Sequence, residues 1–286
     1  NRALPLLHDL VFDGNAQVRE AAADGIAERA QAESVETLER VLRDPDRAVR
    51  IAVVRALSQI RDRSVVGVAL FLVYDNDPEI KKFAILALCN ANHEDALTVL
   101  RLQAQDRDPE IAREVLGAII ALAPEQAAGL FESALATLRP EDLVRLAQRF
   151  GDRFMPFLEQ AVAAPRSVNR LAAIEAARMV PTREPEFLRA VAATNAHADA
   201  RGAALSRLRA LSCDAGREVA LALLNDRDAT VRIQAAQILG ECGGPPVVEP
   251  LRGALLDPEE SVRVAAAANL LALDKPRRPA PKGKKR

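Results

Sequence analysis

Residues 226–236 read DRDATVRIQAA, and residues 257–267 repeat the arrangement as DPEESVRVAAA. Residues 44–54, DPDRAVRIAVV, carry the same aspartate, the same valine-arginine pair five residues later, and small apolar residues behind it. Related segments return at intervals of about 31 residues along the chain. A fixed period of roughly 20–50 residues is typical of solenoids, in which each unit packs mainly on its neighbours. The pattern therefore predicts a solenoid.

Each repeat is predicted to hold two helices joined by a tight turn. Apolar or small residues recur three, four and seven or eight positions after the first apolar residue of the second helix, as one helical face requires. An aspartate or asparagine three residues before this anchor, such as Asp46 or Asp228, is placed to cap the helix. The nine anchors are Val18, Val49, Ile80, Ile111, Leu143, Val168, Ala200, Val231 and Val262.

These units resemble HEAT repeats, and more closely the short bacterial type named after phycobilisome lyases. The resemblance implies an all-α, right-handed α-solenoid of about nine helix-turn-helix repeats over residues 1–274. It is poor at about residues 124–166, where prolines interrupt the pattern and the turn aspartates are missing. Two interpretations of this irregular repeat stay open: a bend or hinge in the solenoid, or a repeat whose sequence has drifted.

Charge is unevenly distributed, although the whole chain has a net charge of only −1. Residues 275–286 hold seven of the 39 basic residues, which leaves 32 basic and 40 acidic residues in residues 1–274, a net of −8. An acidic body argues against a nucleic-acid groove. The basic tail is predicted to be disordered, and either to contact anionic lipid or nucleic acid or to remain solvated.

The three cysteines, Cys89, Cys213 and Cys242, form no CxxC pair and no even framework, which predicts a reducing compartment. The sequence shows no apolar run of transmembrane length and no signal peptide, so we expect a cytoplasmic protein. Because the chain starts at Asn1 without an initiator methionine, we also expect a piece of a longer protein. If that longer protein is a membrane protein, we expect this chain to lie on its cytoplasmic face. Any membrane contact would then be made by the basic tail or by an upstream segment.

The regular spacing of turn aspartates and second-helix arginines along the chain admits two interpretations. The arginines form either a basic row for phosphate or acidic peptide, or a ladder of ion pairs that joins neighbouring repeats. The ladder is favoured because both residue types coincide in the best-formed repeats. Its predicted members are Asp44, Arg50, Asp226, Arg232, Asp257 and Arg263.

The resemblance places the second helices on the inner, concave face, so their outward positions are predicted to touch a partner protein. Charged residues gather at these positions toward the start of the chain and apolar residues toward its end. The alternative is a plain solvated face. The predicted binding residues are Arg55, Lys82, Arg113, Arg170, Ile233 and Val264.

Catalytic and metal-binding patterns are missing from the sequence. His93-Glu94 is similar to the iron-binding pairs of deoxyhypusine hydroxylase, but neither His8 nor His197 repeats the pair. No zinc spacing, nucleophile elbow or phosphate loop is present. With no Trp and only Tyr74 as a tyrosine, base extrusion of the DNA-glycosylase kind is also disfavoured.

We therefore expect no catalytic residue, metal, cofactor or small-molecule substrate. The predicted function is that of a non-catalytic bacterial scaffold or adaptor that binds another protein on its concave face. The resemblance also allows two alternatives: a phycobilin lyase-type subunit, or a regulatory domain of a larger membrane or signalling protein.

Overall fold

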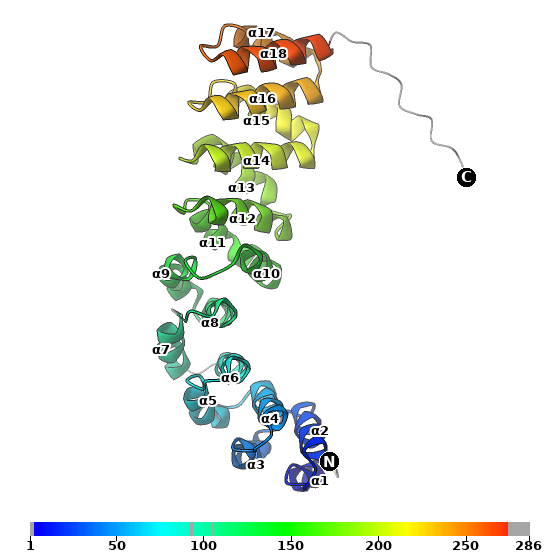
Figure 1. Cartoon of the computed structure of the whole chain (residues 1–286), viewed down its shortest axis with the longest axis vertical. Coiled ribbons are helices and arrows are strands. Elements are labelled where there is room, and N and C mark those ends of the chain that lie inside the picture. Colours follow the sequence, from blue (N-terminus) through cyan, green and yellow to red (C-terminus); the bar gives the residue numbers. More distant parts are fainter. Residues whose placement is uncertain (1–2, 92–93, 105, 274–286) are drawn as a thin grey trace, which may run out of the picture. The chain divides into compact units, whose positions relative to one another are not determined.

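The computed structural model describes residues 3–91, 94–104 and 106–273, and the basic tail at residues 275–286 lies outside them. Within these ranges the chain forms α-helices and short 3-10 helices and no strand (Figure 1). The predicted all-α repeat fold is thereby confirmed. The chain divides into two compact units, Asn1–Asp142 and Leu143–Arg286, and the division falls inside the irregular stretch 124–166.

The first unit consists of helix pairs in which, except in the last pair, a shorter first helix is followed by a longer second helix. The short 3-10 helices η1 (Ala32–Ser34) and η2 (Arg63–Val65) lead into two of the first helices. The pairs are α1 (Ala3–Leu10) with α2 (Ala16–Ala27), α3 (Val35–Val41) with α4 (Arg47–Gln59), α5 (Val66–Leu72) with α6 (Pro78–Ala91), α7 (Glu94–Gln103) with α8 (Pro109–Leu122), and α9 (Pro124–Ala134) with α10 (Pro140–Phe150), the last reaching into the second unit.

The second unit repeats the arrangement, and its second helices lie one above another in Figure 1. Three 3-10 helices, η3 (Gly151–Phe154), η4 (Ala177–Met179) and η5 (Pro245–Val247), extend or introduce its helices. The pairs are α11 (Met155–Ala161) with α12 (Ser167–Ala176), α13 (Glu184–Thr194) with α14 (Ala198–Leu211), α15 (Cys213–Leu223) with α16 (Ala229–Cys242), and α17 (Val248–Ala254) with α18 (Glu260–Leu273).

The turn aspartates start the second helices as predicted. Asp46 caps α4 by accepting a hydrogen bond from the Ala48 amide, and Asp228 caps α16 by accepting one from Thr230. The aspartate two residues earlier shapes the turn, since Asp226 accepts a hydrogen bond of 2.8 Å from the Asp228 amide. These turns are therefore specified by their own short side chains, which satisfy amides that helix geometry leaves without partners.

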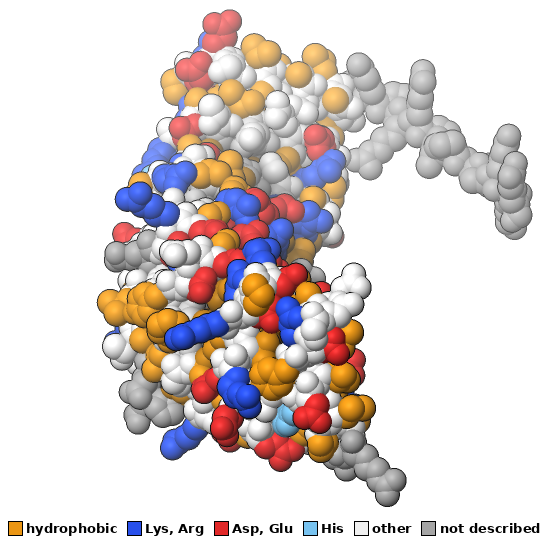
Figure 2. All heavy atoms as spheres, turned by 60° about the horizontal axis from the view of Figure 1, so that its bottom comes forward, with side chains coloured by type: hydrophobic (Ala, Val, Ile, Leu, Met, Phe, Trp, Pro, Cys, Tyr) orange, Lys and Arg blue, Asp and Glu red, His pale blue; other side chains and the backbone are white. Residues whose placement is uncertain are grey.

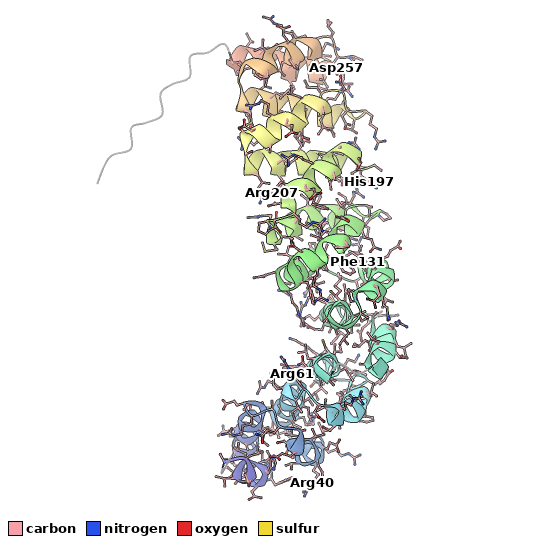
Figure 3. The ribbon with its side chains drawn as sticks, turned by 180° about the vertical axis from the view of Figure 1, so that it is seen from behind. Arg40, Arg61, Phe131, His197, Arg207 and Asp257 are labelled. Atoms are coloured by element: carbon pink, nitrogen blue, oxygen red, sulfur yellow. A yellow bond between two sulfur atoms is a disulfide. The ribbon has the colours of Figure 1, made fainter. Side chains whose placement is uncertain are left out.

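The anchors and the small residues behind them form the core between stacked second helices. Val231, Val262 and Ala235 are buried where α16 packs on α18 and α14, and Phe131 of α9 fills the core of the first unit (Figure 3). The sixth repeat departs from the predicted register by one residue. Val168 is exposed while Asn169 is buried, so the anchor is Asn169, 31 residues before Ala200. The sequence prediction aligned the repeats on their first apolar residue, and this rule selected Val168 because the buried anchor, Asn169, is polar.

Candidate functional site

A row of arginines on the second helices connects consecutive repeats through one recurring geometry. Arg232 of α16 donates from Nε and Nη2 to the two carboxylate oxygens of Asp257, at 2.8 and 2.9 Å. Its Nη1 donates to the Asp226 carbonyl of its own turn at 2.9 Å. Arg201 of α14 binds Asp226 in the same way, at 2.7 and 2.6 Å. Such a bidentate fork fixes both distance and orientation between neighbouring repeats.

In the first unit the same fork joins Arg19 of α2 to Asp44, at 2.7 and 2.9 Å. Two of the predicted ladder arginines instead clamp only their own turns. Arg50 donates to the Asp44 carbonyl at 2.7 Å, and Arg263 donates to the Asp257 carbonyl at 2.8 Å. For Arg263 the reason is its position on α18, the last helix of the described residues.

Two residues predicted to bind a partner are buried in ion pairs between helices, which corrects their assignment to an open surface. Arg170 is 6% exposed and donates to Asp199 from Nε at 3.0 Å and from Nη2 at 2.7 Å. Arg170 holds the ladder position of its repeat, one residue after the anchor Asn169, but its partner Asp199 belongs to the first turn of α14 and not to the turn before it. The one-residue register error had moved Arg170 to an outward position. Arg113 is 9% exposed and donates to the fully buried carboxylate of Asp142 at 2.9 Å. Neither guanidinium is open to a partner.

The pKa values of the ladder aspartates depend on both their burial and their hydrogen bonds. Burial alone would raise the pKa of Asp226, but hydrogen bonds from Arg201 and the Asp228 amide outweigh it and hold that pKa below its usual value. At Asp199, burial is likewise opposed by hydrogen bonds from Arg170 and Ser167, which lower the pKa to about 2. Both carboxylates are therefore charged at neutral pH, as a ladder of ion pairs requires.

The depressed pKa of Asp199 predicts a specific sensitivity to acid. A carboxylate whose pKa falls from 3.8 in the unfolded chain to about 2 in the fold stabilises the protein above the higher value. That contribution is lost as the pH falls through about 2. We expect the difference in unfolding free energy between the wild type and Asp199→Asn to shrink as the pH drops from about 4 to about 2. Urea unfolding at a series of pH values measures this difference.

Asp214→Asn is the matched control, because its carboxylate is 85% exposed. This variant is expected to follow the acid dependence of the wild type. An Asp199→Asn protein that loses stability on acidification as steeply as the wild type would contradict the assignment.

The predicted residues Arg55 and Lys82 lie on the second helices of the first unit. Arg55 of α4 forms an ion pair with Asp24 of α2, and both side chains are about half exposed. Lys82 of α6 is half-buried and makes no ion pair within the described residues. Figure 2 shows acidic and basic side chains interspersed over one face of the molecule. This part of the second-helix surface is thus polar and largely charge-balanced.

The second helices of the second unit present a surface of different character. Val264 of α18 is 61% exposed and Leu271 of the same helix is exposed, while Ile233 of α16 is half-buried. Leu171 of α12 occupies the equivalent outward position and is exposed as well. We call Leu171, Ile233, Val264 and Leu271 the apolar strip. Leu171 was missed from the sequence because the register of its repeat was misplaced by one residue.

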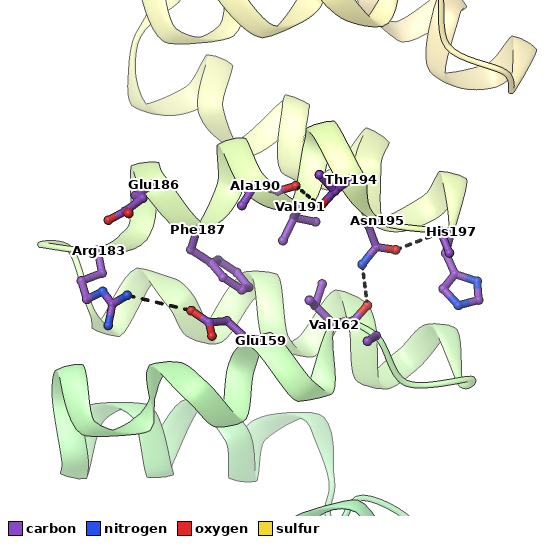
Figure 4. Close-up of a pocket in the computed structure, with 12 residues that line it drawn as sticks. Glu159, Val162, Arg183, Glu186, Phe187, Ala190, Val191, Thr194, Asn195 and His197 are labelled. Atoms are coloured by element: carbon purple, nitrogen blue, oxygen red, sulfur yellow. Dashed lines mark hydrogen bonds and ion pairs between the residues drawn. The ribbon is translucent and has the colours of Figure 1, made fainter. Parts of the chain in front are cut away.

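A groove of about 410 Å³ lies between the first helices α11 and α13 (Figure 4). Its floor is formed by the nearly buried Val162, Phe187 and Val191. At its rim, Arg183 pairs with Glu159 at 3.9 Å, and the Asn195 amide group donates to the Val162 carbonyl at 2.9 Å. The groove can accept an apolar side chain but presents no activated nucleophile. In the sequence, the apolar residues of its floor cannot be told from ordinary core residues, so the groove could not be predicted.

Cys213, at the start of α15, and Cys242, at the end of α16, form a disulfide with their Cα atoms 5.3 Å apart. The expectation of unpaired thiols was wrong, because the helix hairpin brings together two cysteines that lie 29 residues apart in sequence. The bond weighs against the reducing compartment inferred from the cysteine count, since disulfides persist mainly in oxidising surroundings.

The described residues contain neither a metal-binding cluster nor a membrane-spanning helix. No cluster of three or more His, Cys, Asp or Glu side chains suited to a metal is found there, and His93 lies outside the described residues. None of the described helices has the length and apolar character that crossing a membrane requires.

The family model for HEAT repeats matches residues 3–68 and 185–272. Human deoxyhypusine hydroxylase in complex with glycerol is 18% identical, with 95% of this chain and 96% of that chain covered and a TM-score of 0.40. The CpcE–CpcF complex of phycocyanin lyase from Nostoc sp. PCC7120 is 16% identical, with 94% of both chains covered and a TM-score of 0.41. An engineered protein is 18% identical, covering 95% and 89%, with a TM-score of 0.38. No curated protein matches the chain.

Proposed function

Because the chain belongs to the family of HEAT-repeat proteins, whose model matches more than half of its residues, we propose that it is a non-catalytic scaffold. In this proposal the scaffold binds another protein on the outward face of its second helices. The observation that supports the proposal most directly is the apolar strip of the second unit. Apolar side chains at outward positions of several second helices are suited to an interaction surface.

The strip is suited to a partner helix with an apolar face. Its side chains come from α12, α16 and α18, and stacked helices lie roughly 8–10 Å apart, so the strip extends across several repeats. Ile233, Val264 and Leu271 carry no charge, which favours apolar anchors over a charged segment. The ladder beneath holds the helices in place, so that little ordering cost arises on binding.

The second helices of the first unit offer a complementary, polar contact. Arg55 and Lys82 are the two predicted binding residues that stay accessible there. In the proposal they contact polar or acidic groups of a partner protein. Because exposed charge pairs contribute little to affinity, we assign them to orientation and specificity and assign the binding energy to the apolar strip.

Introducing charge into the strip is expected to abolish partner binding. The double variant Leu171→Glu/Val264→Glu places two carboxylates where an apolar partner surface would bury them, which is costly without a counter-charge. Affinity capture from the native host with quantitative mass spectrometry should then recover the specific partner at least about tenfold less than wild type does.

Leu256→Glu is the control, because Leu256 is 88% exposed at the end of α17 and lies outside the strip. It should capture the partner as the wild type does. If the double variant and the wild type capture the same proteins in the same amounts, or if only nucleic acid is captured, the proposal is wrong.

A further inference from the structure

The first helices of the first unit and the turns that follow them carry an unusual set of exposed aromatic side chains. The chain has only eight Phe and one Tyr. Phe71 is 78% exposed, Tyr74 is 57% exposed, and Phe12 is exposed as well. Leu102, 68% exposed, continues the series. Because phenylalanine is normally buried, three exposed aromatic residues at the ends of first helices and in the turns behind them require an explanation.

These residues and two arginines occupy two neighbouring positions of the repeat, 31 residues apart along the chain: Phe12, Arg43 and Tyr74 share one, and Arg40, Phe71 and Leu102 share the other. Phe71 at the end of α5 and Leu102 at the end of α7 are 31 residues apart, and the two helices pack together. Arg40 of α3 places its guanidinium 4.6 Å from the centre of the Phe12 ring, which joins the first repeat to the second. Figure 2 shows hydrophobic side chains gathered at the left edge of the molecule, on the side where Figure 1 draws α5 and α7.

Basic side chains accompany the aromatic ones. Arg40, labelled in Figure 3, and Arg43 are exposed on the repeat before Phe71, and Arg101 is exposed beside Leu102. Within the described part of the chain, none of these three arginines makes an ion pair with a carboxylate, whereas ladder arginines such as Arg19 do. We call Phe12, Arg40, Arg43, Phe71, Tyr74 and Leu102 the aromatic–arginine strip.

The combination of chemistries indicates the kind of ligand. Aromatic and arginine side chains are the residues that most often dominate protein interfaces, since both bring large contact area and the guanidinium also binds carboxylates. The rings of Phe71 and Tyr74 would pack on an apolar side chain, while Arg40 and Arg43 would pair with flanking carboxylates. A long polyanion fits less well, because residues 1–274, the strip included, have a net charge of −8.

We propose that the aromatic–arginine strip is a second docking surface, which binds an acidic segment of a partner protein that carries an aromatic or aliphatic anchor. It lies on the first helices and is independent of the second-helix face in the proposed function. The scaffold thereby offers two chemically different surfaces, one uncharged and one basic.

The test is fluorescence anisotropy of a labelled peptide, EDEFEDLEE, titrated with the full chain at low ionic strength. The peptides EDESEDSEE, which lacks the anchors, and KRKFKRLKK, which reverses the charge, are compared with it. A labelled oligothymidine is the nucleic-acid arm. We expect EDEFEDLEE to bind, and both other peptides to bind at least about tenfold more weakly.

Two variants probe the strip from different sides. Phe71→Ser/Tyr74→Ser removes the aromatic surface, and Arg40→Glu/Arg43→Glu reverses the charge; each is expected to weaken binding at least about tenfold. Because all four residues are exposed, the thermal transition should stay near that of the wild type. Leu256→Ser and Arg61→Glu are matched controls that change an exposed apolar and an exposed basic residue outside the strip.

Unchanged binding in both strip variants, or no binding of EDEFEDLEE to the wild type, would overturn the proposal. So would oligothymidine binding that is tighter than peptide binding and lost in the same variants, since the strip would then be a nucleic-acid site. Charge introduced at Leu171 and Val264 leaves this assay unaffected, so failure here and failure of the proposed function are distinguishable.

Discussion

Replacing Arg201 by methionine is expected to lower the free energy of unfolding of the second unit by about 3–5 kcal/mol. The Arg201 side chain is only 4% exposed and its partner carboxylate, on Asp226, only 6%. The guanidinium also donates to the carbonyl oxygens of Asn195 and Ala196, at 2.9 and 3.2 Å. Methionine keeps much of the apolar stem but leaves the Asp226 charge and both carbonyls without this partner. Urea unfolding followed by circular dichroism measures the loss.

Arg209→Met is the matched control on the same helix. Arg209 pairs with Glu241 at 2.8 Å, but both side chains are about half exposed, so this change should cost under about 1 kcal/mol. The double variant Arg201→Met/Asp226→Asn should recover much of the loss, because it leaves no unpaired buried charge and keeps a side-chain oxygen that can accept from the Asp228 amide. Equal effects of Arg201→Met and Arg209→Met would show that the ladder does not hold the repeats together.

Loss of the Cys213–Cys242 disulfide is expected to cost about 3–4 kcal/mol in the second unit, on the chain-entropy account of a closed loop of this length. The bond joins the first residue of α15 to the last residue of α16 and so closes the helix hairpin at its open end. Without it, the unfolded chain gains conformational freedom while the folded packing is little changed. Cys213→Ser/Cys242→Ser, compared with the wild type by urea unfolding, measures the difference.

Cys89→Ser provides the control, since Cys89 belongs to the first unit and takes no part in this bond. It should leave unfolding of the second unit unchanged. Dithiothreitol should destabilise the wild type to the level of the double serine variant and have no further effect on that variant. A wild type that is insensitive to the reductant would contradict the disulfide's contribution.

The local features of the fold could be predicted from the sequence because they depend on short-range chemistry. An aspartate placed before an apolar helix face specifies a cap wherever it occurs, and Asp46 and Asp228 both act in this way. The pairing of Arg232 with Asp257 also follows from their fixed positions in successive repeats. The 31-residue period thus predicts the contacts between equivalent positions of neighbouring repeats.

Features that depend on three-dimensional neighbours could not be predicted in this way. The apolar run at Phe71, Leu72 and Val73 does not tell which side chain leaves the core, yet Phe71 is exposed while the other two are buried. Arg170 was assigned to the open surface because the buried anchor of its repeat is the polar Asn169. Sequence alignment on apolar residues fails where a repeat buries a polar one.

In the proposed function, the second unit binds its partner through second helices that the ladder holds in register. Hydrogen–deuterium exchange of the full chain, with and without the protein recovered by capture, reports which helices the partner covers. We predict that binding slows exchange in α12, α14, α16 and α18, and that the Leu171→Glu/Val264→Glu variant shows no such change. Slowed exchange confined to α11, α13, α15 and α17, with the second helices unaffected, would contradict the claim.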